Sequence, residues 1–282
     1  MSARTVLRVI PGVDSEDGAG VKLKRSMGRN PASRVDPFLM LDAFSSANPD
    51  DYLAGFPPHP HRGFETVTYM LNGHMIHRDH MGNEGELRAG GVQWMTAGRG
   101  VIHEERPQKV NGLMRGFQLW VNLPAHDKMK PAAYQNIDPE EVPQFDLNEG
   151  ASIRLVAGRL SLDEAQIVGP IQAEATDPLY IDLILQAWSE VTLPVMPDYH
   201  AVIYLFEGAA MIAGEQLQRD AATQLTEGES ITLRTEGESA RMLILAGKPL
   251  NEAVAQYGPF VMNTMEEVEQ ALADYRDGTL TR

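Results

Sequence analysis

The chain has 282 residues, a length that favours two domains of roughly 130–150 residues each. Its formal net charge of −15 argues against binding to nucleic acid or to anionic membranes, because such binding relies on clustered basic side chains. The sequence contains no cysteine, which excludes disulfides, thiolate catalysis and cysteine-ligated metal centres. No apolar run reaches the ~18–20 residues of a transmembrane helix, and the first ten residues do not resemble a signal peptide. We therefore expect a cytoplasmic protein without nucleic-acid or membrane partners.

Turn-forming residues divide the first half into short segments typical of strands. The sequence holds 25 glycines and 18 prolines, and most intervals between them are too short for long helices. Strands are expected at 66–71, 74–80, 91–96 and 113–121. The first of these ends at Asn72-Gly73, a strong signal for a hairpin turn.

The second half continues the same pattern until its last segment. Strands are expected at 180–185, 191–195, 201–206, 210–212, 230–233 and 241–245. Before them, the polar and proline-rich stretch 131–150 is expected to link two domains, with one short helix near 139–142. A helix is expected at 265–275, where Thr264 and Glu267 have the spacing of a capping box.

A weak internal repeat relates the two halves. YMLNG at 69–73 matches YLFEG at 204–208, and each is followed by further strand segments. The match predicts two β-barrels in tandem. The expected domains are an N-terminal metal-binding barrel at 1–130, a linker at 131–150 and a C-terminal barrel at 151–282.

Two short segments carry the residues that favour a metal site: PHPHRGFE at 58–65 and GRGVIHEE at 98–105. Residues two apart in a strand point to the same face, so His59 and His61 project together, as do His103 and Glu105. If both strands face one barrel interior, three imidazoles and one carboxylate converge there. This donor set suits a borderline divalent metal such as Fe(II), Mn, Co, Ni, Cu or Zn and leaves positions open for a substrate or O₂.

The alternative is that His59 and His61 are surface loop residues, and that His103 and Glu105 form a local ion pair. That alternative does not explain four ligand-type residues at matched spacing in strand-like segments. A further three histidines, at 74, 77 and 80, are expected not to form one site, because a spacing of three alternates between strand faces. We expect them to be solvated or satisfied within the core.

The segments 55–73 and 90–103 resemble the first and second cupin motifs. Longer strings resemble the pirin family nearly end to end: DPFLMLDAF (36–44), HPHRGFETVTYML (59–71), QWMTAGRGVIHEE (93–105) and GFQLWVNLP (116–124). The resemblance implies an all-β bicupin, with two tandem jelly-roll β-barrels and a C-terminal helix. It also implies one metal ion per chain, bound by His59, His61, His103 and Glu105, with Glu65 near the site but not on the metal.

Bacterial pirins resemble quercetin 2,3-dioxygenases, so the resemblance implies a metal-dependent dioxygenase that opens a flavonol ring with O₂. Fe(II) is the expected functional ion, with other divalent transition metals as alternatives. Glu105 is expected to accept the substrate proton as well as to bind the metal. The competing hypothesis is a metal- or redox-dependent regulator that acts through protein partners, as eukaryotic pirins resemble transcription cofactors.

The C-terminal barrel is expected to bind no metal. Aligning the halves on Gly73 and Gly208 places Pro194 opposite His59 and Met196 opposite His61. The segment 228–247, where a second motif would lie, contains no histidine. One histidine, His200, among scattered carboxylates does not supply the several converging ligands that a borderline metal needs.

Overall fold

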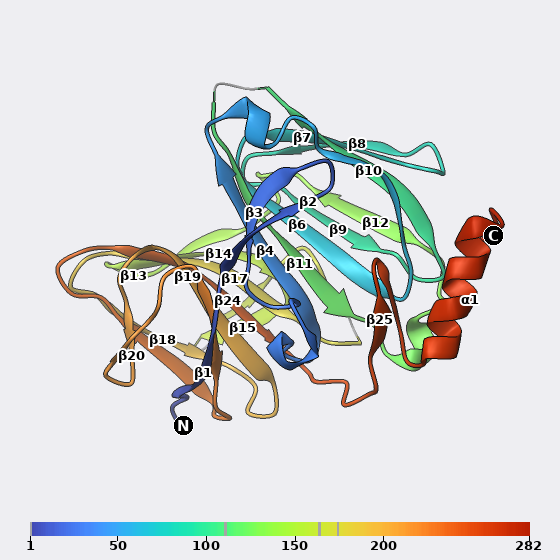
Figure 1. Ribbon diagram of the computed structural model, residues 1–282. Coiled ribbons are helices and arrows are strands. Elements are labelled where there is room, and N and C mark those ends of the chain that lie inside the picture. Colours follow the sequence, from blue (N-terminus) through green and yellow to red (C-terminus); the bar gives the residue numbers. More distant parts are fainter. Residues whose placement is uncertain (1, 110–111, 163–164, 174) are drawn as a thin grey trace. The chain divides into compact units, whose positions relative to one another are not determined.

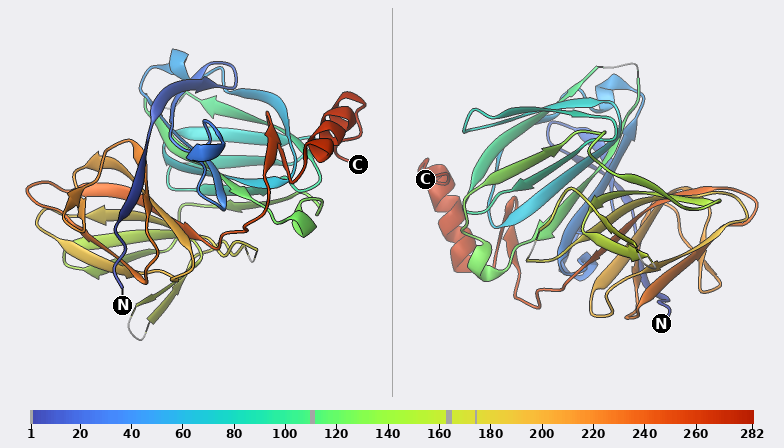
Figure 2. Two further views of the ribbon diagram at one scale, coloured as in Figure 1. Left: turned by 60° about the horizontal axis from the view of Figure 1, so that its bottom comes forward. Right: turned by 180° about the vertical axis from the view of Figure 1, so that it is seen from behind.

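The computed structural model describes residues 2–109, 112–162, 165–173 and 175–282. It contains two compact units, each assembled from three pieces of the chain (Figures 1 and 2). The unit that we call the first barrel comprises Asp14–Arg25, Phe38–Glu140 and Leu250–Arg282. The second barrel comprises Met1–Val13, Ser26–Pro37 and Glu141–Pro249.

Each barrel has one seven-stranded and one four-stranded antiparallel sheet among the described residues. The large sheet of the first barrel has the order β12 (Ala133–Ile137), β9 (Val92–Thr96), β6 (Phe64–Asn72), β11 (Met114–Asn122), β4 (Phe38–Ser46), β3 (Val21–Arg25) and β2 (Val13–Asp17). Its small sheet has the order β5 (Phe56–His61), β10 (Val101–Gln108), β7 (His74–Asp79) and β8 (Glu84–Arg88).

The second barrel repeats this arrangement. Its large sheet has the order β1 (Val6–Pro11), β22 (Ala221–Leu225), β19 (His200–Gly208), β24 (Ala240–Gly247), β17 (Leu179–Leu185), β14 (Ala151–Ala157) and β13 (Gln144–Asn148). Its small sheet has the order β18 (Glu190–Pro194), β23 (Ser230–Arg234), β20 (Met211–Ile212) and β21 (Glu215–Gln216). The repeat seen in the sequence falls on β6 and β19, the third strand of each large sheet.

The remaining elements are short. Two hairpins stand outside these sheets, β15 (Arg159–Leu162) with β16 (Ala165–Val168) and β25 (Ala255–Tyr257) with β26 (Phe260–Met262). Three single 3₁₀ turns cover Pro31–Ser33, Pro49–Asp51 and Ala125–Asp127. The α-helix that the structure describes is α1 (Met265–Arg276), so the expectation of an all-β fold with a C-terminal helix is confirmed.

The α1 helix begins with the capping box expected from the sequence. The Thr264 hydroxyl accepts a hydrogen bond from the Glu267 backbone N–H at 3.2 Å, and the Glu267 carboxylate accepts one from the Thr264 N–H at 3.0 Å. The helix buries Val268 and Ala271 and leaves Met265 exposed. No helix among the described residues is long and apolar enough to cross a membrane.

The two ends of the chain are exchanged relative to the expected domain ranges 1–130 and 151–282. The strand β1 pairs with β22 in the second barrel, whereas residues 250–282, with α1, belong to the first. An edge of a sheet can be completed by any strand that satisfies its backbone groups. The periodicity of a terminal segment therefore does not reveal which barrel it joins.

The expected linker at 131–150 is largely strand. β12 pairs with β9 in the first barrel, and β13 pairs with β14 in the second. The short helix expected near 139–142 is wrong, because this stretch forms a turn. Pro143 has no N–H to donate into a helix, and its carbonyl accepts a hydrogen bond from the Leu155 N–H at 3.1 Å instead.

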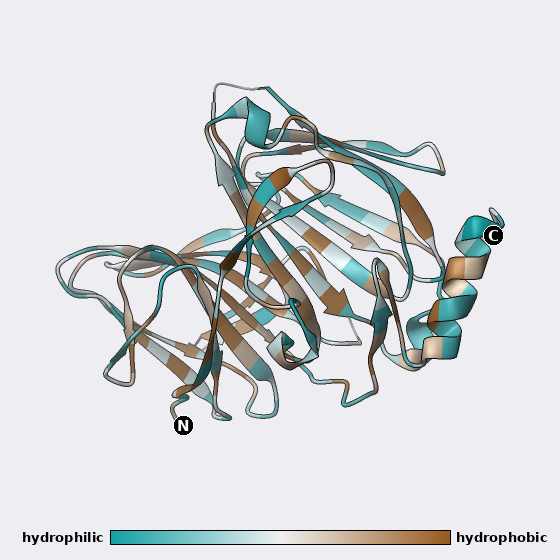
Figure 3. Cartoon of the chain, in the orientation of Figure 1, coloured by the Kyte–Doolittle hydropathy of each residue, from teal (hydrophilic) through white to brown (hydrophobic). Residues whose placement is uncertain are grey.

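Hydrophobic and hydrophilic residues alternate along many strands, as Figure 3 shows. In the second barrel, 26 buried apolar residues form one continuous cluster. In the described part of the first barrel, four smaller apolar clusters have eight, five, three and three buried members. Buried polar side chains, among them His61, His103 and Glu105, lie in the same barrel.

Candidate metal centre

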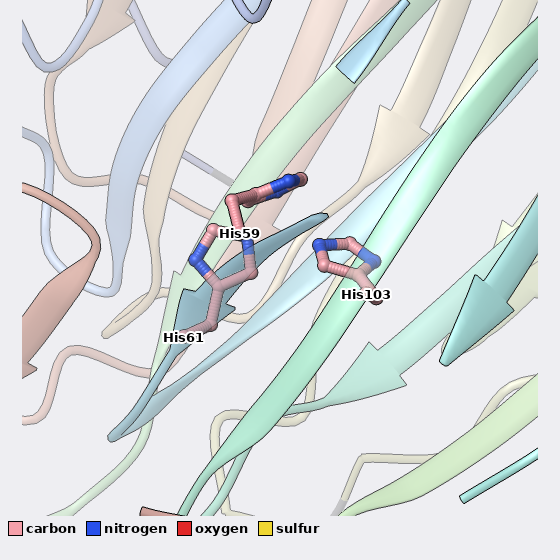
Figure 4. Close-up of side chains that lie close together, drawn as sticks. All are labelled: His59, His61 and His103. Atoms are coloured by element: carbon pink, nitrogen blue, oxygen red, sulfur yellow. The ribbon is translucent and has the colours of Figure 1, made fainter. Parts of the chain in front are cut away.

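The strands β5 and β10 bring three histidines together (Figure 4). In the antiparallel pairing of these strands His103 stands opposite His59, and Val101 stands opposite His61. Because His59 and His61 are two residues apart, both rings lie on the face that carries His103. One ligand atom from each of the three rings lies within 4.8 Å of the other two.

The three rings surround a small common volume. The ring centroids are 4.3 Å apart for His59 and His103, 4.7 Å for His59 and His61, and 4.9 Å for His61 and His103. His61 and His103 are buried, with 3% and 2% of their surface exposed, whereas His59 is half-buried. Solvent therefore reaches the cluster on the side of His59.

Two of the imidazoles have one nitrogen held by a partner. His59 Nδ1 lies 2.9 Å from the Pro57 carbonyl oxygen, and His103 Nδ1 shares a hydrogen bond of 2.5 Å with His77 Nε2. Metal-binding histidines characteristically use their second ring nitrogen in this way, which fixes the tautomer and the orientation of the ring.

Each of the two buried rings has one nitrogen without a partner. Within the described residues, His61 Nδ1 and His103 Nε2 are fully buried and make no hydrogen bond. A buried polar atom without a partner costs about 1–3 kcal/mol, so it is rare unless a ligand satisfies it. The three-histidine cluster therefore fits a borderline divalent metal ion.

Burial also sets the protonation of these rings. It lowers the pKa values of His61 and His103 well below the ordinary 6.5, and the proximity of His59 lowers both further. Both rings are consequently neutral at pH 7. Neutral imidazole is the form that binds a metal ion.

Glu105 is buried beside the cluster, but its oxygens are not part of the compact group of ligand atoms formed by the histidines. The pairing of β10 with β5 shifts register between His103 and Glu105, with the extra residue in β5, so Glu105 keeps the two-residue repeat of β10 and lies on the same face as His103. The carboxylate accepts hydrogen bonds from Thr68 Oγ1 at 3.3 Å and from Gln118 Nε2 at 3.3 and 3.4 Å. Burial raises the pKa of Glu105, and His59, Gln118 and Thr68 offset part of that rise.

The sequence did not identify three polar side chains that surround these residues. His77 was expected to be solvated or satisfied within the core, and it is buried in contact with His103. Thr68 and Gln118 orient the Glu105 carboxylate, but a single polar residue in a strand does not by itself indicate a site. For Thr68 the available signal is the two-residue repeat of its strand, which places it on the same face as Thr66 and Met70.

Glu65 is the buried carboxylate that was expected near the site but not on the metal, and the group of converging ligand atoms does not include it. It is three residues from Thr68 on β6 and therefore points to the opposite face of the strand. Its carboxylate accepts a hydrogen bond of 2.6 Å from Thr96 Oγ1, and Lys130 Nζ lies 3.9 Å away. Burial raises the pKa of Glu65, an effect that Thr96 and Lys130 partly offset.

The remaining histidines have no part in the cluster. His74 lies 3.6 Å from the Glu86 carboxylate at the surface, and His126 is exposed. In the second barrel, His200 Nδ1 lies 2.7 Å from the Asp36 carbonyl oxygen. Within the described residues, the group of three ligand-type side chains close enough to hold an ion is His59, His61 and His103.

Two barrels of the same strand order, one of which holds buried histidines on its small sheet, define a bicupin with one candidate metal centre. Family models agree with this class. The pirin model matches residues 20–121, and the model of the pirin C-terminal cupin domain matches residues 180–281. The first match runs from β3 to β11 of the first barrel and includes residues 26–37 of the second barrel, whereas the second match begins in β17 of the second barrel and ends in the C-terminal segment of the first.

Relatives of known name cover nearly the whole chain. A Pseudomonas aeruginosa protein whose name proposes quercetin 2,3-dioxygenase activity is 52% identical over 98% of both chains. Human pirin is 36% identical over 98% of this chain and 93% of its own. The crystal structure of a quercetin 2,3-dioxygenase from Acinetobacter baumannii superposes with a TM-score of 0.90 at 33% identity, covering 99% of each chain. The chain belongs to the pirin family.

Proposed function

We propose that the chain is a metal-dependent dioxygenase of the pirin type, which opens the central ring of a flavonol with O₂. The observation that carries the proposal is the set of three converging histidines, in which each of the two buried rings has one nitrogen without a partner. An interior that keeps unpaired polar atoms at this cost is suited to binding an ion rather than to packing.

His59, His61 and His103 would hold the ion, and Glu105 is proposed as its fourth ligand. When bound, an open divalent metal supplies Lewis acidity, which lowers the pKa of a coordinated hydroxyl. Fe(II) is the proposed functional ion. A nitrogen-rich site binds Cu, Ni and Zn more tightly than Fe(II), so the ion found after purification depends on the supply during growth.

Glu105 is proposed to accept the proton of the flavonol 3-hydroxyl. Its carboxylate is held on one side by Thr68 and on the other by Gln118. Gln118 is itself held, because its Oε1 accepts a hydrogen bond of 3.4 Å from Trp120 Nε1. The chain Trp120–Gln118–Glu105 thus fixes the direction of the base before a substrate arrives.

Aromatic side chains beside His61 are proposed to receive the flat rings of the substrate. Phe64 and Trp120 lie with centroids 4.3 Å apart, and both contact the His61 ring edge-on, at 5.1 and 5.4 Å. Planar aromatic substrates bind such walls through stacking and edge-to-face contacts worth about 0.5–1.5 kcal/mol per pair. The names of the Pseudomonas relative and the Acinetobacter structure support a flavonol as the substrate.

The test is aerobic incubation of the Fe(II)-loaded protein with quercetin. Loss of the long-wavelength flavonol absorbance, with one CO released per quercetin consumed, is the expected result. The metal-free protein and the His103→Ala variant serve as controls and should leave the flavonol intact. A loaded protein that holds its ion and leaves quercetin unchanged would contradict the proposal and favour a metal-dependent regulator with a protein partner.

A further inference from the structure

A segment near the C-terminus runs beside the strand that carries His61. The Arg62 N–H donates to the Pro259 carbonyl at 3.4 Å, and the Val261 N–H donates to the Arg62 carbonyl at 3.1 Å. Arg62 and Phe260 form an isolated parallel bridge. About 200 residues of sequence thus separate His61 from the backbone that borders it.

Two glycines make room for this segment at the ends of the ligand-bearing strands. A Cβ at Gly63, two residues after β5, would lie 2.0 Å from the Val261 carbonyl oxygen. A Cβ at Gly100, directly before β10, would lie 2.2 Å from the Leu280 carbonyl oxygen. Both glycines have positive φ, at +89° and +154°, so side chains are disfavoured there for two independent reasons.

Two buried cations, Lys128 and Arg62, hold the C-terminal segment beside β5. Lys128, with 1% of its surface exposed, donates to the carbonyls of Gly63 at 2.7 Å and Val261 at 3.0 Å, and to Asn122 Oδ1 at 2.7 Å. The Lys128 ammonium therefore bridges the end of β5 and the C-terminal segment.

The Arg62 guanidinium extends the connection to α1. Its Nη1 donates to the Asp274 carboxylate at 2.7 Å, its Nη2 donates to the Leu280 carbonyl at 3.0 Å, and its Nε donates to the Arg99 carbonyl. Arg62 is 4% exposed, so the ion pair with Asp274 is shielded from solvent on the arginine side. Arginine is suited to this role because its planar fork serves several acceptors at once.

Apolar contacts also connect the C-terminal segment with the surroundings of His61 and His103. Val261 belongs to the cluster with Phe64 and Trp120, the two rings that contact His61. Leu280 and Phe260 belong to a cluster against which Ile102, the neighbour of His103, is packed. The C-terminal segment therefore touches the surroundings of both buried histidines.

We propose that residues 259–280 position His61 and thereby set the metal affinity of the first barrel. Val261 packs with Phe64 and Trp120, whose rings contact His61, and the Pro259 carbonyl accepts a hydrogen bond from the backbone N–H of Arg62, the residue after His61. The segment thus borders a ring whose Nδ1 is buried without a partner. Arg62, Lys128 and Asp274 act as positioning residues, because they hold this segment beside the His61 ring and do not touch the ion. The inference rests on the proposed metal site. Loss of such outer partners typically weakens metal binding 10–100-fold.

The test compares Asp274→Ala with Glu269→Ala. Both remove one carboxylate from α1, but Glu269 is exposed and Asp274 binds Arg62. Affinity for Co(II) is measured by competition with a chelator, and the tautomer of the His61 ring is read from its ¹⁵N shifts in the metal-free protein. We expect Asp274→Ala to bind Co(II) about tenfold more weakly and to show a mixed tautomer. Glu269→Ala should match the parent in both, and Asp274→Asn, which keeps an acceptor oxygen, should recover most of the affinity.

Equal Co(II) affinity and equal ¹⁵N shifts in Asp274→Ala and the parent would overturn the inference. A parent protein that binds no Co(II) would instead overturn the proposed metal site, while the ¹⁵N shifts would still report whether α1 controls the ring. If Asp274→Ala does not fold, as judged by circular dichroism, Asp274→Leu, which has a similar size and no acceptor oxygen, takes its place. Its affinity should fall about tenfold below that of Glu269→Ala, and equality of the two would overturn the inference.

Discussion

The two barrels share a strand order and differ in what their small sheets present to the interior. In the first barrel β5 and β10 carry histidines, and their rings meet between the strands. In the second barrel the corresponding strands are β18 and β23, which carry Val191, Leu193, Ile231 and Leu233 on the buried face. These four residues join the continuous apolar cluster. The same arrangement of two strands can therefore present converging histidines or part of a closed apolar core. The difference lies in the side chains on one face of each strand.

The difference has an energetic consequence for each barrel. Burying a leucine or isoleucine side chain stabilises the folded state by about 1.5–3 kcal/mol. The second barrel buries such side chains throughout its interior. The first barrel instead keeps buried polar groups, among them Thr68, His103 and Glu105, that need partners and contribute little net stability.

The largest expected difference between the barrels is the loss of bound metal when a histidine is substituted. His103→Ala should reduce the bound metal from one ion per chain to none, because it removes a ligand whose second nitrogen is already fixed by His77. His200→Ala, in the second barrel, should leave one ion in place. Elemental analysis after loading and desalting measures both. Two ions per parent chain, or full retention in His103→Ala, would break the comparison.

A second large effect is expected within the first barrel. Glu105→Gln keeps the size of the side chain and a donor to the ion, but it cannot accept a proton. Quercetin turnover at saturating substrate should fall roughly 10²–10⁴-fold, the usual loss when a general base is removed. Metal content should be determined on the same sample. Unchanged turnover with unchanged metal would reduce Glu105 to a ligand or a bystander.

A core truncation tests the packing of the second barrel. Leu193 is fully buried in the apolar cluster, so Leu193→Ala should lower the free energy of unfolding by about 2–5 kcal/mol. Urea denaturation measures the loss. The exposed Leu7→Ala substitution is the matched control and should change stability by less than about 0.5 kcal/mol. A small loss at Leu193 would show that the second interior is not closely packed.

The smallest effect concerns the response of each barrel to the ion. A ligand that binds the folded state at 100 times its Kd stabilises it by about 2.7 kcal/mol. Hydrogen exchange should therefore slow in β5 and β10 when the metal is added, while β18 and β23 exchange at their metal-free rates. Equal slowing in all four strands would show that the ion stabilises the chain as one cooperative unit.

Local patterns were sufficient to predict the frame and the histidine triplet. The two-residue repeat placed His59 and His61 on one face, and the turn at 98–100 set His103 on the facing strand. The repeat at 69–73 and 204–208 lies on strands in the same position of each large sheet. The capping box identified the beginning of α1 because its two hydrogen bonds join residues three apart. All of these depend on neighbours in the sequence.

Features that depend on pairing between distant segments could not be predicted. His77 enters the site because β7 pairs with β10 and places it opposite Glu105, a register that no local spacing of histidines reveals. The extra residue of β5 opposite 103–105 is likewise a feature of strand pairing. The segment that borders His61 is held through the backbone carbonyls of Pro259 and Val261, and every residue type carries a carbonyl. Sequence patterns give no signal for such contacts.

The exchange of the chain ends has a consequence for the order in which the protein is made. Synthesis proceeds from the N-terminus, so the strands of the first barrel up to residue 140 emerge before all strands of the second except β1. Yet the segment that borders β5 and contributes Val261 and Leu280 is translated after every strand of both large sheets. Domains generally fold as units during synthesis, earliest part first. Here the barrel whose two sheets are made first is completed last, and the surroundings of His61 are complete only once residues 259–280 have left the ribosome.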